Sequence, residues 1–138
     1  MGANYSVQKV TFEDIQYALQ NKGYVLINTL PPDRQDCLIK DTLPAANEAD
    51  ELNRCLKENL STRMIVYGEN ATDESVMTKC HQLRQLGFLH VYAYAGGLFE
   101  WLLLQDIYGA DLFPTTSFDI EHLKYKGLQR FGVLRLVN

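Results

Sequence analysis

The chain has 138 residues, of which 46% are hydrophobic and 22% are charged. This length and composition predict a single globular domain, and a net charge of -4 at pH 7 argues against a protein that binds nucleic acid. The charge is uneven, because no acidic residue follows Glu121. A small basic tail therefore follows an acidic body, and its cations are Lys124, Lys126, Arg130 and Arg135.

The cysteines and the apolar segments indicate a cytoplasmic protein. Cys37, Cys55 and Cys80 are odd in number and lack metal-ligand spacing, which favours reduced thiols. Residues 1–10 lack the apolar core of a signal peptide, and no apolar segment is long enough to span a bilayer. The three histidines are scattered and form no ligand pair. We expect neither a metal site nor a cofactor.

The first six residues, Met1-Gly2-Ala3-Asn4-Tyr5-Ser6, fit the pattern for N-myristoylation on Gly2. A chance match to this short pattern is the alternative. One myristoyl chain binds membranes with K on the order of 10⁴ M⁻¹, so stable attachment requires a second signal. The basic tail is the candidate, at about 1 kcal/mol per Lys or Arg near an anionic leaflet. We therefore predict that residues 1–9 form an N-terminal segment and that the protein lies peripherally on a cytosol-facing membrane.

Three elements are expected before residue 60. Thr11 is placed to cap a helix that ends before Gly23. The continuous apolar run at residues 24–27 is typical of a strand inside a parallel sheet. A long polar connection at residues 33–46 then leads to a helix at residues 47–59. The predicted apolar stripes are Phe12, Ile15 and Leu19 on the first helix and Ala49, Leu52, Leu56 and Leu60 on the second.

The middle of the chain continues the alternation of strands and helices. A strand at residues 64–67 is followed by a polar loop and by an amphipathic helix that ends at Gly87. The next strand covers residues 91–94. The helix at residues 98–105 is apolar on nearly all sides, so we expect it to be deeply packed. The apolar face of the amphipathic helix is Val76, Met77, Cys80, Leu83 and Leu86.

The last part of the chain is predicted less regularly. Ser117 is placed to cap a short helix at residues 118–125, and residues 132–138 form either an edge strand or a loose tail. No linker or repeat divides the chain. We therefore expect one domain at residues 10–138, with residues 110–138 as a C-terminal extension. Alternating strands and helices predict a parallel sheet with helices on both faces.

The loop after the strand at residues 64–67 is the candidate functional site. Loops between a parallel strand and a helix collect ligands and catalytic groups, because unpaired helix amides lie there. This loop has no Cys, His, Lys or Arg, and its three carboxylates favour the helix N-terminus, with Thr72 as a possible cap. A cation site is the less favoured interpretation. The candidate binding residues are Gly68, Glu69, Asn70, Ala71, Thr72, Asp73, Glu74 and Ser75.

Four features between residues 10 and 109 occur in a distinctive order. They are Leu26-Ile27-Asn28 before a proline-containing turn, Thr42-Leu43-Pro44-Ala45-Ala46, Ile65-Val66-Tyr67 before the loop, and a stretch from Leu86-Gly87-Phe88 through Val91-Tyr92 to Gly96-Gly97 and Trp101. Together they resemble the rhodanese-like (sulfurtransferase) family, and the last feature is the most specific. The resemblance implies a three-layer α/β/α fold with a mostly parallel central sheet of about five strands.

The resemblance fails where the chemistry of that family lies. A rhodanese carries its sulfur as a persulfide on a Cys directly after the central strand, and an Arg five residues later stabilises the anion. Here those positions are Gly68 and Asp73, neither a nucleophile nor a cation. The family's Asp and Arg after the first core strand correspond to Asn28 and Leu30. We therefore expect no catalytic residue and predict a non-catalytic binding, scaffold or regulatory module with an unknown protein partner.

Two other functions stay open. Cys55 and Cys80 are interpreted as small core residues, whereas Cys37 lies in a polar connection and is the one thiol expected to be exposed. A sulfurtransferase or sulfur carrier that uses Cys37 is one alternative. The other is a small-ligand sensor, because Gly68 leaves room where a side chain stood and the loop amides can form a shallow nest.

Overall fold

The computed structural model describes residues 6–119 and 121–132. Its strands form one sheet in the order β1-β5-β4-β2-β3, and all neighbouring pairs are parallel. The strands are β1 (Gln8–Val10), β2 (Tyr24–Asn28), β3 (Thr42–Leu43), β4 (Arg63–Tyr67) and β5 (His90–Tyr94). The α-helices are α1 (Phe12–Leu19), α2 (Glu48–Glu58), α3 (Ser75–Leu86) and α4 (Gly97–Tyr108), and the 3-10 helices are η1 (Pro32–Arg34), η2 (Ala45–Asn47) and η3 (His122–Tyr125). The predicted parallel α/β sheet is confirmed.

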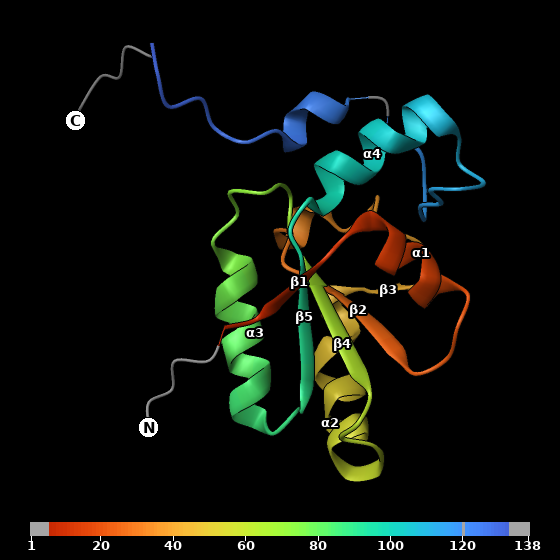
Figure 1. Ribbon diagram of the computed structural model, residues 1–138, viewed down its shortest axis with the longest axis vertical. Helices are drawn as coiled ribbons and strands as arrows, with labels where there is room; N and C mark the ends of the chain where they lie inside the picture. Colours follow the sequence, from red (N-terminus) through yellow and green to blue (C-terminus); the bar gives the residue numbers. More distant parts are fainter. Residues whose placement is uncertain (1–5, 120, 133–138) are drawn as a thin grey trace.

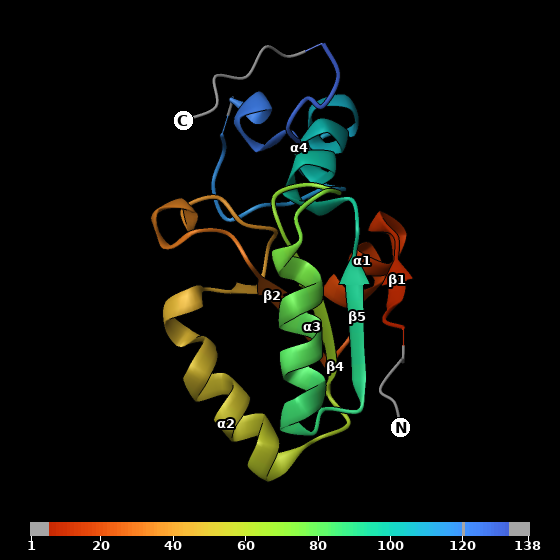
Figure 2. The same ribbon diagram turned by 90° about the vertical axis from the view of Figure 1, so that its left-hand side faces the viewer.

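Helices cover both faces of the sheet, because the central strands bury side chains in both directions. On β4, Ile65 and Tyr67 belong to one apolar cluster, while Met64 and Val66 belong to another. The first cluster contains residues of α1 and α4, and the second contains residues of α2 and α3. Figure 2 shows α2 and α3 together on one side of the strands and α1 on the other. The three-layer arrangement is therefore confirmed.

Local signals set several helix ends as predicted. The Thr11 N–H donates to Asp14 Oδ2 at 2.8 Å, as in a capping box at the start of α1. Gly87 ends α3 with a φ of 114°, a left-handed conformation that favours glycine. The predicted apolar stripes are buried at Ile15, Leu52, Val76, Cys80 and Leu83, but Ala49, Leu60 and Leu86 are exposed.

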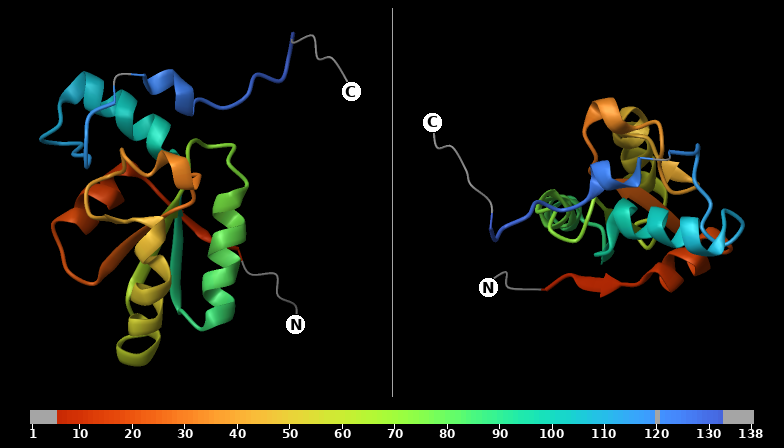
Figure 3. Two further views of the ribbon diagram at one scale, coloured as in Figure 1. Left: turned by 180° about the vertical axis from the view of Figure 1, so that it is seen from behind. Right: turned by 90° about the horizontal axis from the view of Figure 1, so that it is seen from above.

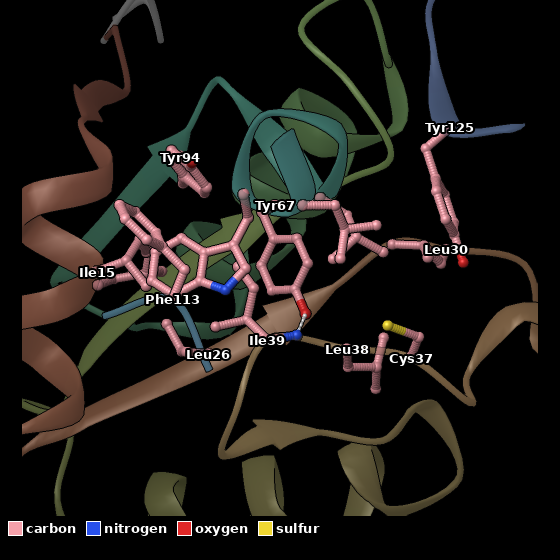
Figure 4. Close-up of a cluster of buried hydrophobic side chains, with 14 of the residues drawn as sticks. Ile15, Leu26, Leu30, Cys37, Leu38, Ile39, Tyr67, Tyr94, Phe113 and Tyr125 are labelled. Carbon is pink, nitrogen blue, oxygen red and sulfur yellow. Dashed lines mark hydrogen bonds between the residues drawn. The ribbon is translucent and has the colours of Figure 1, made fainter. Parts of the chain in front are cut away.

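The connection predicted at residues 33–46 contains the short edge strand β3, which pairs with β2. The side chain of Tyr67 explains why this segment is held against the sheet. Its hydroxyl accepts a hydrogen bond from the Ile39 N–H at 3.1 Å and lies 2.7 Å from Thr42 Oγ1, and Figure 4 shows the bond to Ile39. Tyr67 is fully buried, and burial raises the pKa of its hydroxyl, which therefore stays neutral.

Helix α4 is longer than predicted and only partly buried. Leu98 and Trp101 lie in the core, but Leu103 is exposed and Ile107 is 70% exposed. The prediction of a deeply packed helix is therefore wrong for its outer face. The helix lies across the end of the molecule at which the strands terminate (Figure 1). The apolar residues of α4 are therefore divided between the core and the exposed surface of the helix.

The chain after α4 continues across the same end of the molecule, as the view from above shows (Figure 3). The helix predicted at residues 118–125 is wrong in extent, because among the described residues of this range the regular structure is the 3-10 helix η3. The Ser117 hydroxyl, predicted as its cap, instead donates to the carbonyl of Asp36 at 2.9 Å. The predicted strand or tail at residues 132–138 lies outside the described residues, apart from Gly132.

The described residues that come next to the two predicted membrane signals lie at opposite edges of the sheet. Since β1 is parallel to β5, the chain enters β1 from the amino edge, whereas the segment after α4 crosses the carboxyl edge (Figure 1). Gly2 and Arg135 themselves lie outside the described residues. Among the helices that the structure describes, none has the length and apolar content needed to cross a membrane.

Candidate functional site

The loop between β4 and α3 lies at the carboxyl edge of the sheet, beside the start of α4 (Figure 1). This is where the sequence placed the candidate site. All eight predicted residues, 68–75, belong to this loop or to the first position of α3. Several of these residues are hydrogen-bonded to one another, to Thr29 or to the segment after α4.

Asp73 turns its carboxylate back into the loop. One oxygen accepts a hydrogen bond from the Glu69 N–H at 3.0 Å, and the other accepts one from the Ser75 N–H at 3.0 Å. The Ser75 hydroxyl also bonds to Asp73 and lies 2.8 Å from Thr29 Oγ1. The N-cap residue of α3 is Glu74, which makes no side-chain cap bond, so the cap suggested at Thr72 is wrong, and Asp73 instead accepts the amide of Ser75, the first residue of the helix. The amides of Glu69 and Ser75 are therefore satisfied by the chain itself.

Gly68 does not leave an empty space. A Cβ atom at this position would lie 2.3 Å from Asp73 Oδ2 and 2.8 Å from Thr29 Oγ1. Both distances are well below the separation of about 3.5–4.0 Å at which non-bonded atoms attract each other best. The expectation of vacant room beside Gly68 is therefore wrong, because the Asp73 carboxylate fills it.

A second set of hydrogen bonds closes the outer side of the loop. Asn70 Oδ1 accepts from the Thr72 N–H at 3.0 Å and from the Thr72 hydroxyl at 2.7 Å. The Asn70 side-chain amide donates to the carbonyl of Tyr125 at 2.9 Å. Burial raises the pKa of Tyr125 to about 12, so its hydroxyl stays protonated and donates to Asp119. The segment around η3 is thus fixed over the loop.

The three loop carboxylates do not form one acidic site. Glu69 forms an ion pair with Arg34 of η1, while Asp73 binds the loop amides. Glu74 lines an open groove of about 710 Å³, together with Lys126 and Arg130 of the segment after η3. Within residues 6–119 and 121–132, no three His, Cys, Asp or Glu side chains are grouped so as to hold a metal ion. Sequence reasoning missed Arg34, which carries no local signal in its polar connection.

The first turn of α4 is also occupied by the loop. The Leu98 N–H donates to the carbonyl of Gly68 at 2.9 Å, and the Phe99 N–H donates to the carbonyl of Glu69 at 2.8 Å. Gly97 permits this approach, since a Cβ atom there would lie 2.9 Å from Gly68 O, and its φ is 71°. A helix N-terminus often binds anions, but these two amides are already used.

The positions after β2 hold a neutral network. Asn28 and Leu30, where the resemblance implies Asp and Arg, are both buried. The Gln35 amide donates to Asn28 Oδ1 at 2.8 Å, and the Asn28 amide donates to Gln35 Oε1 at 3.1 Å. Asn28 Oδ1 also accepts from the Leu30 N–H at 3.0 Å. This reciprocal amide pair anchors the turn before η1 without a charge, and the contribution of Gln35 had no sequence signal.

Cys37 is not the exposed thiol that the sequence predicted. It is 3% exposed and lies beside Leu38 in the apolar cluster of Figure 4. Its thiol donates to the carbonyl of Ser117 at 3.3 Å, and burial raises its pKa. Cys55 and Cys80 are buried as predicted, and burial raises the pKa of Cys80 to about 11. All three thiols are therefore protonated near neutral pH and poor nucleophiles.

A second open groove, of about 440 Å³, lies at the carboxyl end of β2 between α2 and α3. Lys79 and Glu48 line it and form an ion pair, with 2.6 Å between Lys79 Nζ and Glu48 Oε2. Ser75 and Thr29 also face it, so it adjoins the loop. The sequence did not predict this groove, because Lys79 and Glu48 meet only through the packing of α2 beside α3.

No model of a protein family matches the sequence, and no curated protein matches it either. Solved structures are similar in fold. The rhodanese-like domain of the Alr3790 protein from Anabaena sp. superposes with a TM-score of 0.57 at 22% identity, covering 96% of each chain. The single domain sulfurtransferase RDL2 from Saccharomyces cerevisiae gives a TM-score of 0.55 at 19% identity, covering 82% of this chain and 100% of RDL2.

The BH2092 protein from Bacillus halodurans is a further neighbour, with a TM-score of 0.59 at 11% identity, covering 86% of this chain and 90% of BH2092. These structures establish a rhodanese-like α/β fold for the chain. They agree with the fold that the sequence motifs implied.

Proposed function

We propose that this protein is a non-catalytic, rhodanese-like module that acts by binding or scaffolding a partner protein. The observation that carries the proposal is the Asp73 carboxylate in the space beside Gly68. Gly68 offers no nucleophile, and Asp73 places an anion where the family resemblance implies a cation. A persulfide or thiosulfate in this loop would have to displace the carboxylate from the amides of Glu69 and Ser75 and would be repelled by it.

Thiocyanate formation from thiosulfate and cyanide tests the proposal. We expect no rate above the uncatalysed reaction from the wild type or from Gly68→Cys, since Asp73 remains in place in both. The variant Gly68→Cys/Asp73→Arg supplies the nucleophile and the cation together. It is the positive control, because turnover by this variant would show that the assay can detect catalysis at this loop. Turnover by the wild type would overturn the proposal.

A sulfurtransferase or sulfur carrier that uses Cys37 is the first alternative. Its support is weakened by the burial of the thiol and by the hydrogen bond to Ser117. This alternative predicts turnover that disappears in Cys37→Ser and persists in Cys80→Ser, the matched change at another buried thiol.

A small-ligand sensor at the loop is the second alternative. The engagement of the amides of Glu69, Thr72 and Ser75 by Asp73 and Asn70 counts against it, whereas the open groove beside Lys79 favours it. Thermal unfolding with a panel of inorganic anions and divalent cations separates it from the main proposal. A rise in melting temperature that Lys79→Ala removes would favour a sensor, and the absence of any rise would favour a protein partner.

We also propose that Gly2 is myristoylated and that the protein associates peripherally with a cytosol-facing membrane. The support is the sequence pattern from Met1 to Ser6. Intact-mass measurement after coexpression with an N-myristoyltransferase should show the added acyl mass, and Gly2→Ala should lack it. An unmodified wild-type mass would contradict the modification.

A further inference from the structure

Exposed apolar side chains are concentrated at one end of the molecule. Of the twelve large hydrophobic residues that are exposed in the described chain, eight belong to α4 or to the segment after it. This part of the chain forms the end beyond the carboxyl edge of the sheet (Figure 1, Figure 3). The eight residues are Leu103, Ile107, Tyr108, Leu112, Phe118, Leu123, Leu128 and Phe131. Such a concentration on a water-facing surface marks an interaction site.

The last residues of this set are strongly exposed, and Leu128 lines the groove of about 710 Å³ together with Lys126 and Arg130. Phe131 is 89% exposed, Leu128 is 72% exposed and Leu123 is 68% exposed. The exposed cations Lys126 and Arg130 alternate with them along the chain. Lys126 and Arg130 have no ion-pair partner among the described residues, and Lys124, paired with Asp119, keeps its charge at the same surface.

We infer that the face carrying Leu123, Lys126, Leu128, Arg130 and Phe131, here termed the distal face, binds directly to an anionic lipid bilayer. Protruding apolar side chains fit a fluid interface, into which each can insert without a preformed pocket. The neighbouring cations would lie at the headgroups and pair with negatively charged lipids. This inference deepens the proposed membrane association by assigning the surface that makes it.

Charge argues against a second copy of this chain as the occupant. A two-fold symmetric dimer would place the same patch on both sides of the interface. Where the two-fold axis passes through this face, Lys126 and Arg130 would approach the same cations of the second copy and repel them. An anionic bilayer instead complements the charge of the distal face.

The distal face should act without the acyl chain. The described chain begins at Ser6 and enters β1 from the amino edge of the sheet, whereas the distal face belongs to the carboxyl edge. The inference can therefore be tested on protein that carries no myristoyl group. Vesicle binding by the unacylated protein tests the distal face alone, and the intact-mass measurement tests acylation of Gly2 alone. The two proposals can therefore fail independently.

Vesicle flotation with the unacylated full chain is the first test. Vesicles of phosphatidylcholine and phosphatidylserine should bind the protein, and vesicles of phosphatidylcholine alone should not. Lys126→Gln and Arg130→Gln should each weaken binding about fivefold, and together about 25-fold. Lys22→Gln/Lys57→Gln removes the same charge from exposed positions elsewhere and should leave binding within twofold.

The apolar side chains have their own matched pair of variants. Leu128→Ser/Phe131→Ser should weaken binding by about tenfold or more, because two inserting side chains are lost. Leu86→Ser/Leu89→Ser, at exposed positions near the amino end of β5, should not weaken it. Circular dichroism should show all of these variants folded, since the substituted side chains are exposed.

Insertion can be observed directly with a new tryptophan. The natural Trp101 is the single tryptophan and is fully buried, so it contributes a constant background. Phe131→Trp should show a blue shift in emission with vesicles that contain phosphatidylserine, and Leu89→Trp should show none. Equal binding to both kinds of vesicle, or no shift from Phe131→Trp, would overturn the inference. A dimer that depends on Leu128 and Phe131, with no vesicle binding, would assign the face to a second copy and overturn it as well.

Discussion

The loop after β4 and the segment after α4 contact each other at the carboxyl edge of the sheet, yet they leave different groups exposed. In the loop, Asp73 and Asn70 satisfy backbone amides that a ligand would otherwise bind. In the segment, apolar side chains such as Phe131 project into water, with cations between them. The loop therefore uses the amides of Glu69, Thr72 and Ser75 internally, whereas the segment exposes apolar and cationic side chains to water.

This contrast also explains why the position of a loop is weak evidence for activity. The loop lies where parallel α/β proteins place their ligands, at the carboxyl edge beside two helix N-termini. Its internal hydrogen bonds nevertheless use the amides of Glu69, Thr72 and Ser75. Substitutions in the loop should therefore cost stability, while substitutions on the distal face should cost binding and leave stability unchanged.

The largest effect on stability is expected from Gly68→Cys. The new side chain would collide with Asp73 and Thr29, and we expect a loss of about 3 kcal/mol in the free energy of unfolding. Chemical denaturation measures it. The loss should shrink in the Asp73→Gly background, because the colliding carboxylate is absent there. Equal losses in both backgrounds would show that Asp73 does not fill the space.

A smaller effect is expected from Asp73→Ala, at about 1–2 kcal/mol. The change removes the acceptor for the Glu69 and Ser75 amides, and Ser75 is the first residue of α3. Asp73→Asn keeps one oxygen acceptor and should lose less. Glu74→Ala, at the exposed neighbouring position, serves as the control and should be nearly neutral. A neutral Asp73→Ala would contradict the closed loop.

The segment around η3, which lies over the loop, contains the ion pair between Lys124 and Asp119, and we expect the stability that this pair contributes to depend on pH. The hydrogen bond from Lys124 holds the pKa of Asp119 below its usual value. A lowered carboxyl pKa gives stability that is present above the usual value of about 3.9 and is lost as pH falls through the lower folded value. The Lys124 side chain is 39% exposed and the Asp119 side chain 16%, so solvent screens the pair in part and it contributes about 1 kcal/mol or less.

Hydrogen exchange of the amides around η3 is the measurement for this ion pair. Protection should decline in the wild type below about pH 4, after correction for the intrinsic pH dependence of exchange. Asp119→Asn should show weaker protection at neutral pH and no such decline. Identical pH profiles for the two proteins would exclude a role for this pair.

The smallest effect on stability is expected on the distal face. Leu128→Ser/Phe131→Ser should change the free energy of unfolding by no more than about 0.5 kcal/mol, because both side chains are exposed. Chemical denaturation of this variant beside Asp73→Ala makes the comparison quantitative. A loss similar to that of Asp73→Ala would show that these side chains pack in the folded protein.

The elements that the sequence predicted well have local signals. The apolar run of β4, the capping residues of α1 and Gly87 at the end of α3 each indicate structure from neighbouring residues alone. Strand β3 was missed because it has two residues, too few for any periodicity. It is held by Tyr67, which lies far from it in the chain.

The sequence predicted the position of the candidate site but not the hydrogen bonds that Asp73 makes inside it. The loop residues were identified from the end of a strand and the start of a helix, but the direction of the Asp73 side chain has no sequence pattern. The segment around η3 is held over the loop by the hydrogen bond between Asn70 and Tyr125, which are 55 residues apart. The burial of Cys37 likewise depends on Ser117, 80 residues away. Such long-range contacts could not be inferred from spacing or composition.

We claim that the Asp73 carboxylate closes the loop, and an NMR titration of the wild type with thiosulfate measures whether it does. Asp73→Asn, without the repelling charge, provides the comparison. The closed loop predicts that the amide signals of Glu69, Thr72 and Ser75 stay unchanged as thiosulfate is added to the wild type. Saturable shifts of these three signals in the wild type would show that the loop still binds an anion and would contradict the claim.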